Sequence, residues 1–228
     1  MKKIFYFVIA ATALVFGATA CEKTSEGLTG ITYYPVISLQ GDSYMIVDKG
    51  SAFVDPGFIA ELNGEDYSSQ VSVSSNVDTS TSGIYTVSYS AVNEDGFSAT
   101  VNRTVVVLDP NDPIEGFYLT DFSCNRNGTA YGGAYEVLII GEGDGIYAVD
   151  DLLAGWYCVR AGYGTDYAMQ GEIEIADDGT ATMQDSYVPG WGDSADSFEG
   201  SYDFDNGILT YTLVYAGSYN FNVTLVKE

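Results

Sequence analysis

Short segments in which apolar and polar residues alternate occur in both halves of the chain, and this alternation predicts half-buried β-strands. In residues 83–91, the side chains of Tyr85, Val87 and Tyr89 occupy every second position. Successive side chains of a strand point to opposite faces of its sheet, so these three share one face. The same two-residue period recurs across residues 211–225. The pattern therefore predicts an all-β protein.

Turn-forming residues separate the predicted strands. Typical hairpin sequences are Asn93-Glu94-Asp95-Gly96, Asp178-Gly179 and Asn206-Gly207, and a two-residue turn is predicted at Asp178-Gly179. Short strands and turns in the first half predict a small β-sandwich. Consecutive hairpins with one apolar face predict, in the second half, an antiparallel meander that closes into a barrel or a second sandwich. The strands of the first half are expected at residues 36–39, 44–47, 58–60, 71–74, 84–92 and 98–108.

A polar, proline-containing segment, residues 109–113, divides the chain. Both of its prolines disfavour continuation of the preceding strand. The length of 228 residues exceeds that of one typical sandwich and suits two domains. We therefore expect one domain at residues 31–108, a linker at 109–113 and a second domain at 114–228, each folding independently.

The first twenty residues have the features of a signal peptide. Lys2 and Lys3 precede an apolar run, which is followed by small residues and then by Cys21. The run is too short for a comfortable membrane span, so residues 1–20 are expected to be removed. A cysteine directly after the cleavage site resembles a bacterial lipobox, in which the thiol takes a diacylglyceryl group. This resemblance implies a lipid on Cys21, although Ala18 stands where the lipobox usually has leucine; the alternative is a secreted chain cut at the same bond.

Residues 21–30 are expected to form a short polar tether behind the lipid. Glu22 and Glu26 resemble the sorting signal of Bacteroidetes-type lipoproteins that are displayed on the outer face of the outer membrane. The resemblance implies a protein anchored to the outer membrane and facing the cell exterior.

The composition excludes several classes of function. Lys and Arg total 8 against 32 Asp and Glu, which gives a formal net charge of -24. Nucleic acids and anionic lipid surfaces would be repelled by such a chain. Histidine is absent from the sequence, which removes the usual serine and cysteine triads and imidazole-containing zinc sites. We predict no catalytic residues, no metal site and no cofactor.

Three sequence patterns in the first half point to a known domain type. They are Asp55-Pro56-Gly57, the segment Gly83-Ile84-Tyr85-Thr86-Val87-Ser88-Tyr89, and Arg103-Thr104-Val105-Val106-Val107. In this order they resemble the bacterial immunoglobulin-like repeat of surface proteins. The resemblance implies an immunoglobulin-like sandwich that serves as a spacer or platform and carries no catalytic residues.

The second half has a looser resemblance, carried by residues 145–152 and by Gly155-Trp156-Tyr157. These segments are similar to the C-terminal domains that accompany such repeats in surface lipoproteins of Bacteroidetes-type glycan-uptake systems. The resemblance implies a setting and gives no mechanism.

Aromatic residues in glycine-rich segments of the second half form the candidate ligand site. Exposed rings beside carboxylates suit a sugar, because pyranose C–H faces stack on rings while polar groups bind the hydroxyls. The alternative is that these rings fill a tyrosine-rich core. The candidate residues are Trp156, Tyr163, Tyr167, Tyr187 and Trp191.

Two further features have competing interpretations. Cys124 and Cys158 either form a disulfide in the oxidising exterior or remain two buried free thiols. Residues 203–207 resemble the start of a calcium loop but lack its later ligands, so a hairpin explains them better.

The sequence as a whole favours a lipid-anchored cell-surface protein whose immunoglobulin-like domain holds a C-terminal β domain away from the membrane. The outer domain is expected to bind an oligosaccharide or to contribute to a glycan-uptake assembly. The alternative is a structural or adhesive protein that binds another surface protein.

Overall fold

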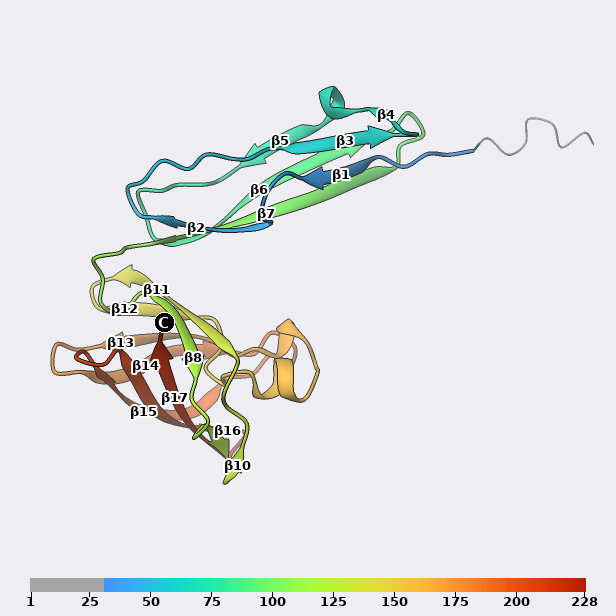
Figure 1. The fold of residues 1–228 in the computed structure, drawn as a ribbon. Helices are drawn as coiled ribbons and strands as arrows, with labels where there is room; N and C mark the ends of the chain where they lie inside the picture. Colours follow the sequence, from blue (N-terminus) through green and yellow to red (C-terminus); the bar gives the residue numbers. More distant parts are fainter. Residues whose placement is uncertain (1–30) are drawn as a thin grey trace, which may run out of the picture.

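The computed structural model describes residues 31–228, whose regular secondary structure is mainly β-strand (Figure 1). The predicted signal peptide, the lipid on Cys21 and the tether lie outside the described residues. Within residues 31–228, the helical segments are too short to cross a bilayer.

The first half folds as two sheets. One contains three strands in the order β1-β3-β4, and the other contains four in the order β2-β7-β6-β5, with β2 parallel to β7. The predicted apolar face of β6 is confirmed, because Val87 and Tyr89 are buried between the sheets and Tyr85 packs against them. The strands are β1 (Val36–Leu39), β2 (Tyr44–Asp48), β3 (Phe58–Leu62), β4 (Glu65–Asp66), β5 (Ser72–Ser75), β6 (Gly83–Val92) and β7 (Ser98–Leu108), with a 3-10 turn at Ser68–Gln70.

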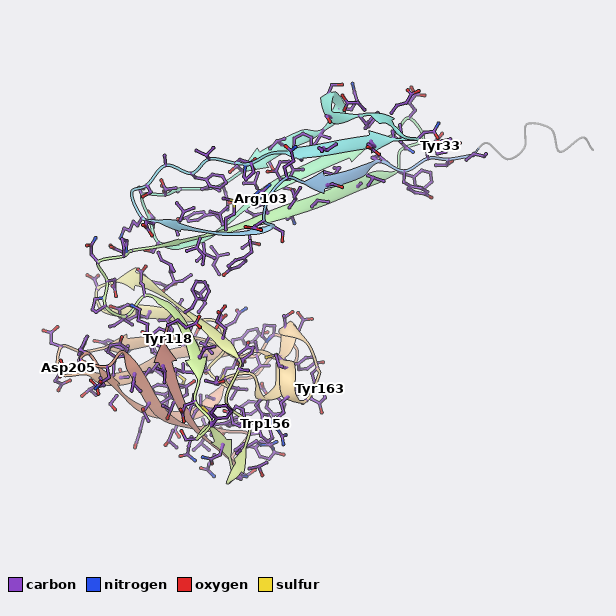
Figure 2. The ribbon with its side chains drawn as sticks, viewed as in Figure 1. Tyr33, Arg103, Tyr118, Trp156, Tyr163 and Asp205 are labelled. Carbon is purple, nitrogen blue, oxygen red and sulfur yellow. The ribbon has the colours of Figure 1, made fainter. Side chains whose placement is uncertain are left out.

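The three sequence patterns of this half meet in one polar network around Arg103, a side chain with no solvent exposure (Figure 2). Its Nη2 donates to the backbone carbonyls of Gln40 (2.8 Å) and Gly57 (2.9 Å). Its Nε lies 3.2 Å from Oδ1 of Asp55. The hydroxyl of Tyr89 donates to the other oxygen of Asp55. Because a buried charge requires such partners, the motif residues have a structural role.

The second half forms a closed antiparallel barrel of eight strands (Figure 1). Each strand pairs with the next barrel strand along the chain, and two short strands outside the barrel, β9 and β10, separate β8 from β11. The last strand pairs with the first, Val226 opposite Leu119, which closes the sheet. The barrel alternative of the sequence analysis is therefore the one observed. Its strands are β8 (Gly116–Thr120), β11 (Glu136–Gly143), β12 (Ile146–Val149), β13 (Gln170–Ile175), β14 (Thr180–Tyr187), β15 (Ala195–Asp203), β16 (Ile208–Tyr215) and β17 (Tyr219–Lys227), and a small hairpin, β9 (Asn125–Arg126) and β10 (Thr129–Ala130), extends from β17.

The two ends of the barrel differ in their connections. One end has short turns, and the linker enters there, because β8 starts at that end. The Asp-Gly turn is longer than predicted: Ala176 donates to Thr180, and Gly179 takes the left-handed conformation at φ +84°. The other end carries residues 121–135, 150–169 and 188–194. Figure 2 shows Asp205 at the short-turn end and Trp156 and Tyr163 towards the loop end.

The two halves share a small apolar contact. Leu138 and Ile140 point outward from the barrel and pack with Val106 of β7, which has no exposed surface. Val137 and Ile139 face the barrel core, so this run of four apolar residues in β11 is buried on both faces. Independent folding of residues 31–108 and 114–228 therefore remains a proposal.

Candidate functional site

The longest connection of the barrel, residues 150–169 between β12 and β13, is held by one buried carboxylate. Oδ1 of Asp151 accepts the N–H groups of Leu153 (2.9 Å) and Met169 (3.0 Å), and Oδ2 accepts that of Gly155 (2.8 Å). The two ends of the loop are thereby tied together. Between them lie a π-helical turn, η2 (Trp156–Arg160), and a 3-10 turn, η3 (Thr165–Tyr167).

The thiol of Cys158 completes this arrangement. Its Sγ lies 3.2 Å from Oδ2 of Asp151, and burial raises the pKa of Cys158 to about 11. A thiol with that pKa is protonated at neutral pH and is a poor nucleophile. Cys124 is also a free, buried thiol, and its Sγ is 3.3 Å from the carbonyl oxygen of Thr224. The two thiols have separate hydrogen-bond partners on different elements, so the disulfide alternative is wrong for this structure.

The connection between β14 and β15 brings Trp191 against the longer loop. The pairing of Val188 with Asp193 closes this shorter loop. The N–H of Gly190 donates to the carbonyl of Asp166 in the longer loop (2.6 Å). A Cβ on Gly190 would lie 2.6 Å from the ring of Tyr167, so glycine permits this close approach of the two loops.

Five rings from these loops and from β16 form what we call the aromatic cluster. The ring centroid of Trp191 lies 4.7 Å from that of Tyr157, 4.8 Å from Tyr167, 6.0 Å from Tyr163 and 6.1 Å from Tyr215. Most of these ring pairs are edge-to-face, a favourable arrangement. Tyr163 is 56% exposed and Trp191 is 42% exposed, whereas Tyr157 and Tyr215 are buried beneath them. The cluster therefore presents two exposed rings on a packed base.

Trp156 does not belong to the exposed surface. It is 6% exposed, and its ring packs against Tyr131 at 5.0 Å and Phe221 at 6.1 Å. The prediction that Trp156 offers a face to a sugar is wrong, and the core alternative is observed. The left-handed Gly155, at φ +83°, turns the chain so that the indole points into the barrel end.

Tyr187 is not one of the rings around Trp191, although its hydroxyl lies near Gly192, the next residue of that loop. It is 48% exposed and lines a cleft of about 320 Å³ on the outer face of the barrel, which Ile84 of the first half also lines. Of the five predicted ligand residues, the structure thus brings together Tyr163, Tyr167 and Trp191.

Sequence reasoning missed two arginines at the same end of the barrel. The guanidinium carbon of Arg126 lies 3.6 Å from the ring centroid of Tyr219 and 5.0 Å from that of Trp156. The guanidinium carbon of Arg160 lies 4.2 Å from the centroid of Trp156. The sequence contained one signal for them: only eight residues are Lys or Arg, and two of these, Arg126 and Arg160, stand close to the aromatic segments.

Asp203, which opens the segment that resembles a calcium loop, makes a hairpin turn. Oδ1 of Asp203 accepts the N–H groups of Asp205 and Asn206, as expected for a hairpin. Across residues 31–228, no three carboxylate or thiol side chains gather in a way that suits a metal ion.

Comparisons with known proteins match both halves of the chain. A family model described as a C-terminal domain matches residues 108–227, and one described as a bacterial surface protein Ig-like domain matches residues 37–107. One solved structure that matches is the crystal structure of the lipoprotein BT2262 from Bacteroides thetaiotaomicron, with a sequence identity of 40% and a TM-score of 0.72. The match covers 85% of this chain and 100% of the BT2262 chain.

Other similarities are weak. A structure of the M60 catalytic domain with the CBM51-1 and CBM51-2 domains of Clostridium perfringens ZmpB is 15% identical. The match covers 87% of this chain and 22% of the Clostridium chain, and its TM-score of 0.29 is too low to support an argument. A search of curated proteins found no match. The identity to BT2262 over its whole length, together with both domain matches, shows that this chain belongs to a family of Bacteroides-type surface lipoproteins with a bacterial immunoglobulin-like domain followed by a C-terminal β domain.

Proposed function

We propose that the C-terminal barrel is a carbohydrate-binding domain and that the aromatic cluster is its binding surface. The observation that carries this proposal is the pair of exposed rings, Trp191 and Tyr163, supported by the buried rings of Tyr157 and Tyr215. Rings fixed before binding lose little conformational entropy when a sugar stacks on them.

Polar groups of the same loops support the proposal. Asp166 and Asp193 are exposed beside the rings, and Oδ1 of Asp193 accepts the hydroxyl of Tyr215 at 2.7 Å. The second oxygen of Asp193 accepts no hydrogen bond within residues 31–228, so it is available to a sugar hydroxyl. A few such groups around an apolar surface would orient a ligand.

The position of the site agrees with a surface role. The linker enters the barrel at the short-turn end, so the loop end faces away from the point where the first half is joined (Figure 1). In the proposed arrangement the immunoglobulin-like domain is a spacer, and the protein supplies sugar binding to a glycan-uptake system.

We expect Trp191→Ala to weaken sugar binding by about 1–3 kcal/mol, roughly 5- to 150-fold, while the barrel stays folded. A glycan array would identify a bound oligosaccharide, and calorimetry with that sugar would give the affinities. Tyr187→Ala is the matched control, because Tyr187 is similarly exposed but lies outside the cluster. The proposal fails when the parent binds no glycan, or when Trp191→Ala binds as the parent does.

The anchor is proposed to be a lipid on Cys21, held in the outer membrane with the protein facing outward. Cys21→Ser removes the thiol that would carry the lipid, so the variant should move from the membrane fraction to the soluble fraction. Fractionation followed by immunoblotting measures this. Retention of Cys21→Ser in the membrane at the parent level would contradict the lipid assignment.

A further inference from the structure

The basic residues of residues 31–228 divide into two groups. Lys49 and Arg103 form ion pairs with aspartates, and Nζ of Lys227 donates to the carbonyl of Pro113. The side chains of Arg126 and Arg160 form neither a salt bridge nor a hydrogen bond within the described part of the chain. In a protein with 32 acidic residues, two cations without an acidic partner are unexpected.

Both unpaired guanidinium groups lie on one indole, that of Trp156, at 5.0 Å and 4.2 Å from its centroid. Attraction between a cation and a ring face holds each group in place. It uses none of the N–H donors, which lie at the edges of the planar guanidinium. Each arginine is therefore positioned while its hydrogen-bonding capacity remains available.

The arginine pair adjoins the aromatic cluster. The centroid of Tyr157, a cluster member, lies 5.5 Å from the guanidinium carbon of Arg126 and 6.5 Å from the centroid of Trp156. Tyr157 in turn contacts Trp191 at 4.7 Å. The structure therefore places Arg126 against a member of the cluster, and Arg160 against the indole next to that member.

We infer that the aromatic cluster binds an acidic sugar, with Arg126 and Arg160 binding the carboxylate of a uronic acid. This inference rests on the proposed carbohydrate-binding function. A guanidinium matches a carboxylate through two parallel N–H···O bonds, which are stronger than bonds between neutral groups. An adjoining sugar ring then lies against Trp191 and Tyr163.

The charge of the whole chain limits the ligand further. The formal net charge is -24, so a polyanionic glycan would meet repulsion over most of the surface. At physiological salt the screening length is about 8 Å, so a single carboxylate bound by these arginines is attracted mainly by the charges nearest to it. The ligand class is therefore an oligosaccharide with isolated uronic acids in an otherwise neutral chain.

The test uses the full-length protein and matched pairs of oligosaccharides, each neutral chain beside the same chain carrying one glucuronic or galacturonic acid. The parent should bind the acidic member of one pair about 10-fold or more tightly than its neutral partner. Arg160→Gln and Arg126→Gln should each reduce that preference several-fold. Lys49→Gln, which removes a positive charge on the other half of the chain, should leave the preference intact.

Other outcomes separate the two proposals. If the parent binds both members of each pair equally and Trp191→Ala binds neither, the acidic-sugar inference is wrong and the carbohydrate-binding proposal stands. An acidic preference that survives both arginine substitutions would also overturn the acidic-sugar inference. Absence of binding to any member would overturn both proposals. Arg160 is exposed, so its variant should fold even where Arg126→Gln does not.

Discussion

Replacing Asp151 with alanine should lower the free energy of unfolding of the barrel by about 3–5 kcal/mol and abolish sugar binding. The carboxylate is fully buried and accepts the N–H groups of Leu153, Gly155 and Met169. Its removal leaves three buried donors without a partner and releases the loop that carries most of the aromatic cluster. Chemical denaturation followed by tryptophan fluorescence measures the loss.

Asp178→Ala is the matched control for this variant. Asp178 also accepts a backbone N–H, that of Thr180 at 2.9 Å, but it lies in an exposed turn at the opposite end of the barrel. Its removal should cost about 1 kcal/mol or less, because water replaces the lost bond. If Asp151→Ala also lowers the free energy of unfolding by only about 1 kcal/mol or less, the loop is held by other contacts.

Replacing Arg103 with methionine should destabilise the N-terminal sandwich by about 3–5 kcal/mol. Methionine retains an apolar stem but takes the cation from the carboxylate of Asp55 and removes the hydrogen bonds that Arg103 donates to the carbonyls of Gln40, Asp42 and Gly57. If residues 31–108 fold independently, only one of two thermal transitions should move. Calorimetry of the intact protein measures both transitions.

The control for Arg103→Met is Lys49→Met, which breaks the ion pair between Lys49 of this half and Asp109 of the linker. The side chains of Lys49 and Asp109 are 38% and 27% exposed, so their attraction is weak and the expected loss is below about 1 kcal/mol. A single transition that moves as a whole in Arg103→Met would contradict independent folding. A shift no larger than that of Lys49→Met would contradict the structural role of Arg103.

The sequence by itself determined the strand content and the buried faces of the strands. Alternate residues of a strand face opposite sides whatever the strand pairs with, so Val87, Tyr89 and Phe221 could be assigned to a core from local spacing alone. The immunoglobulin-like motif was also readable, because its parts are recognised by residue type and order. Its network around Arg103 required contacts across separate strands.

Tertiary structure decided which aromatic residues are exposed. Trp156 and Trp191 both stand in glycine-flanked segments, yet the first is buried and the second is exposed. The direction of Trp156 depends on the left-handed Gly155 directly before it and on the hydrogen bond from Met169 to Asp151, which joins residues eighteen positions apart. Such contacts follow from loop closure and leave no periodic signal in the sequence.

Barrel closure and the placement of the two arginines depend on contacts between residues that are far apart in the sequence. Pairing of β17 with β8 joins residues more than a hundred positions apart, and pairing of β17 with β9 brings Arg126 beside Phe221. Arg160 reaches the same indole from the loop after β12. Local alternation specifies the face of each strand, whereas the meeting of these side chains depends on which edges of the sheet pair, and that is decided only when the whole barrel closes.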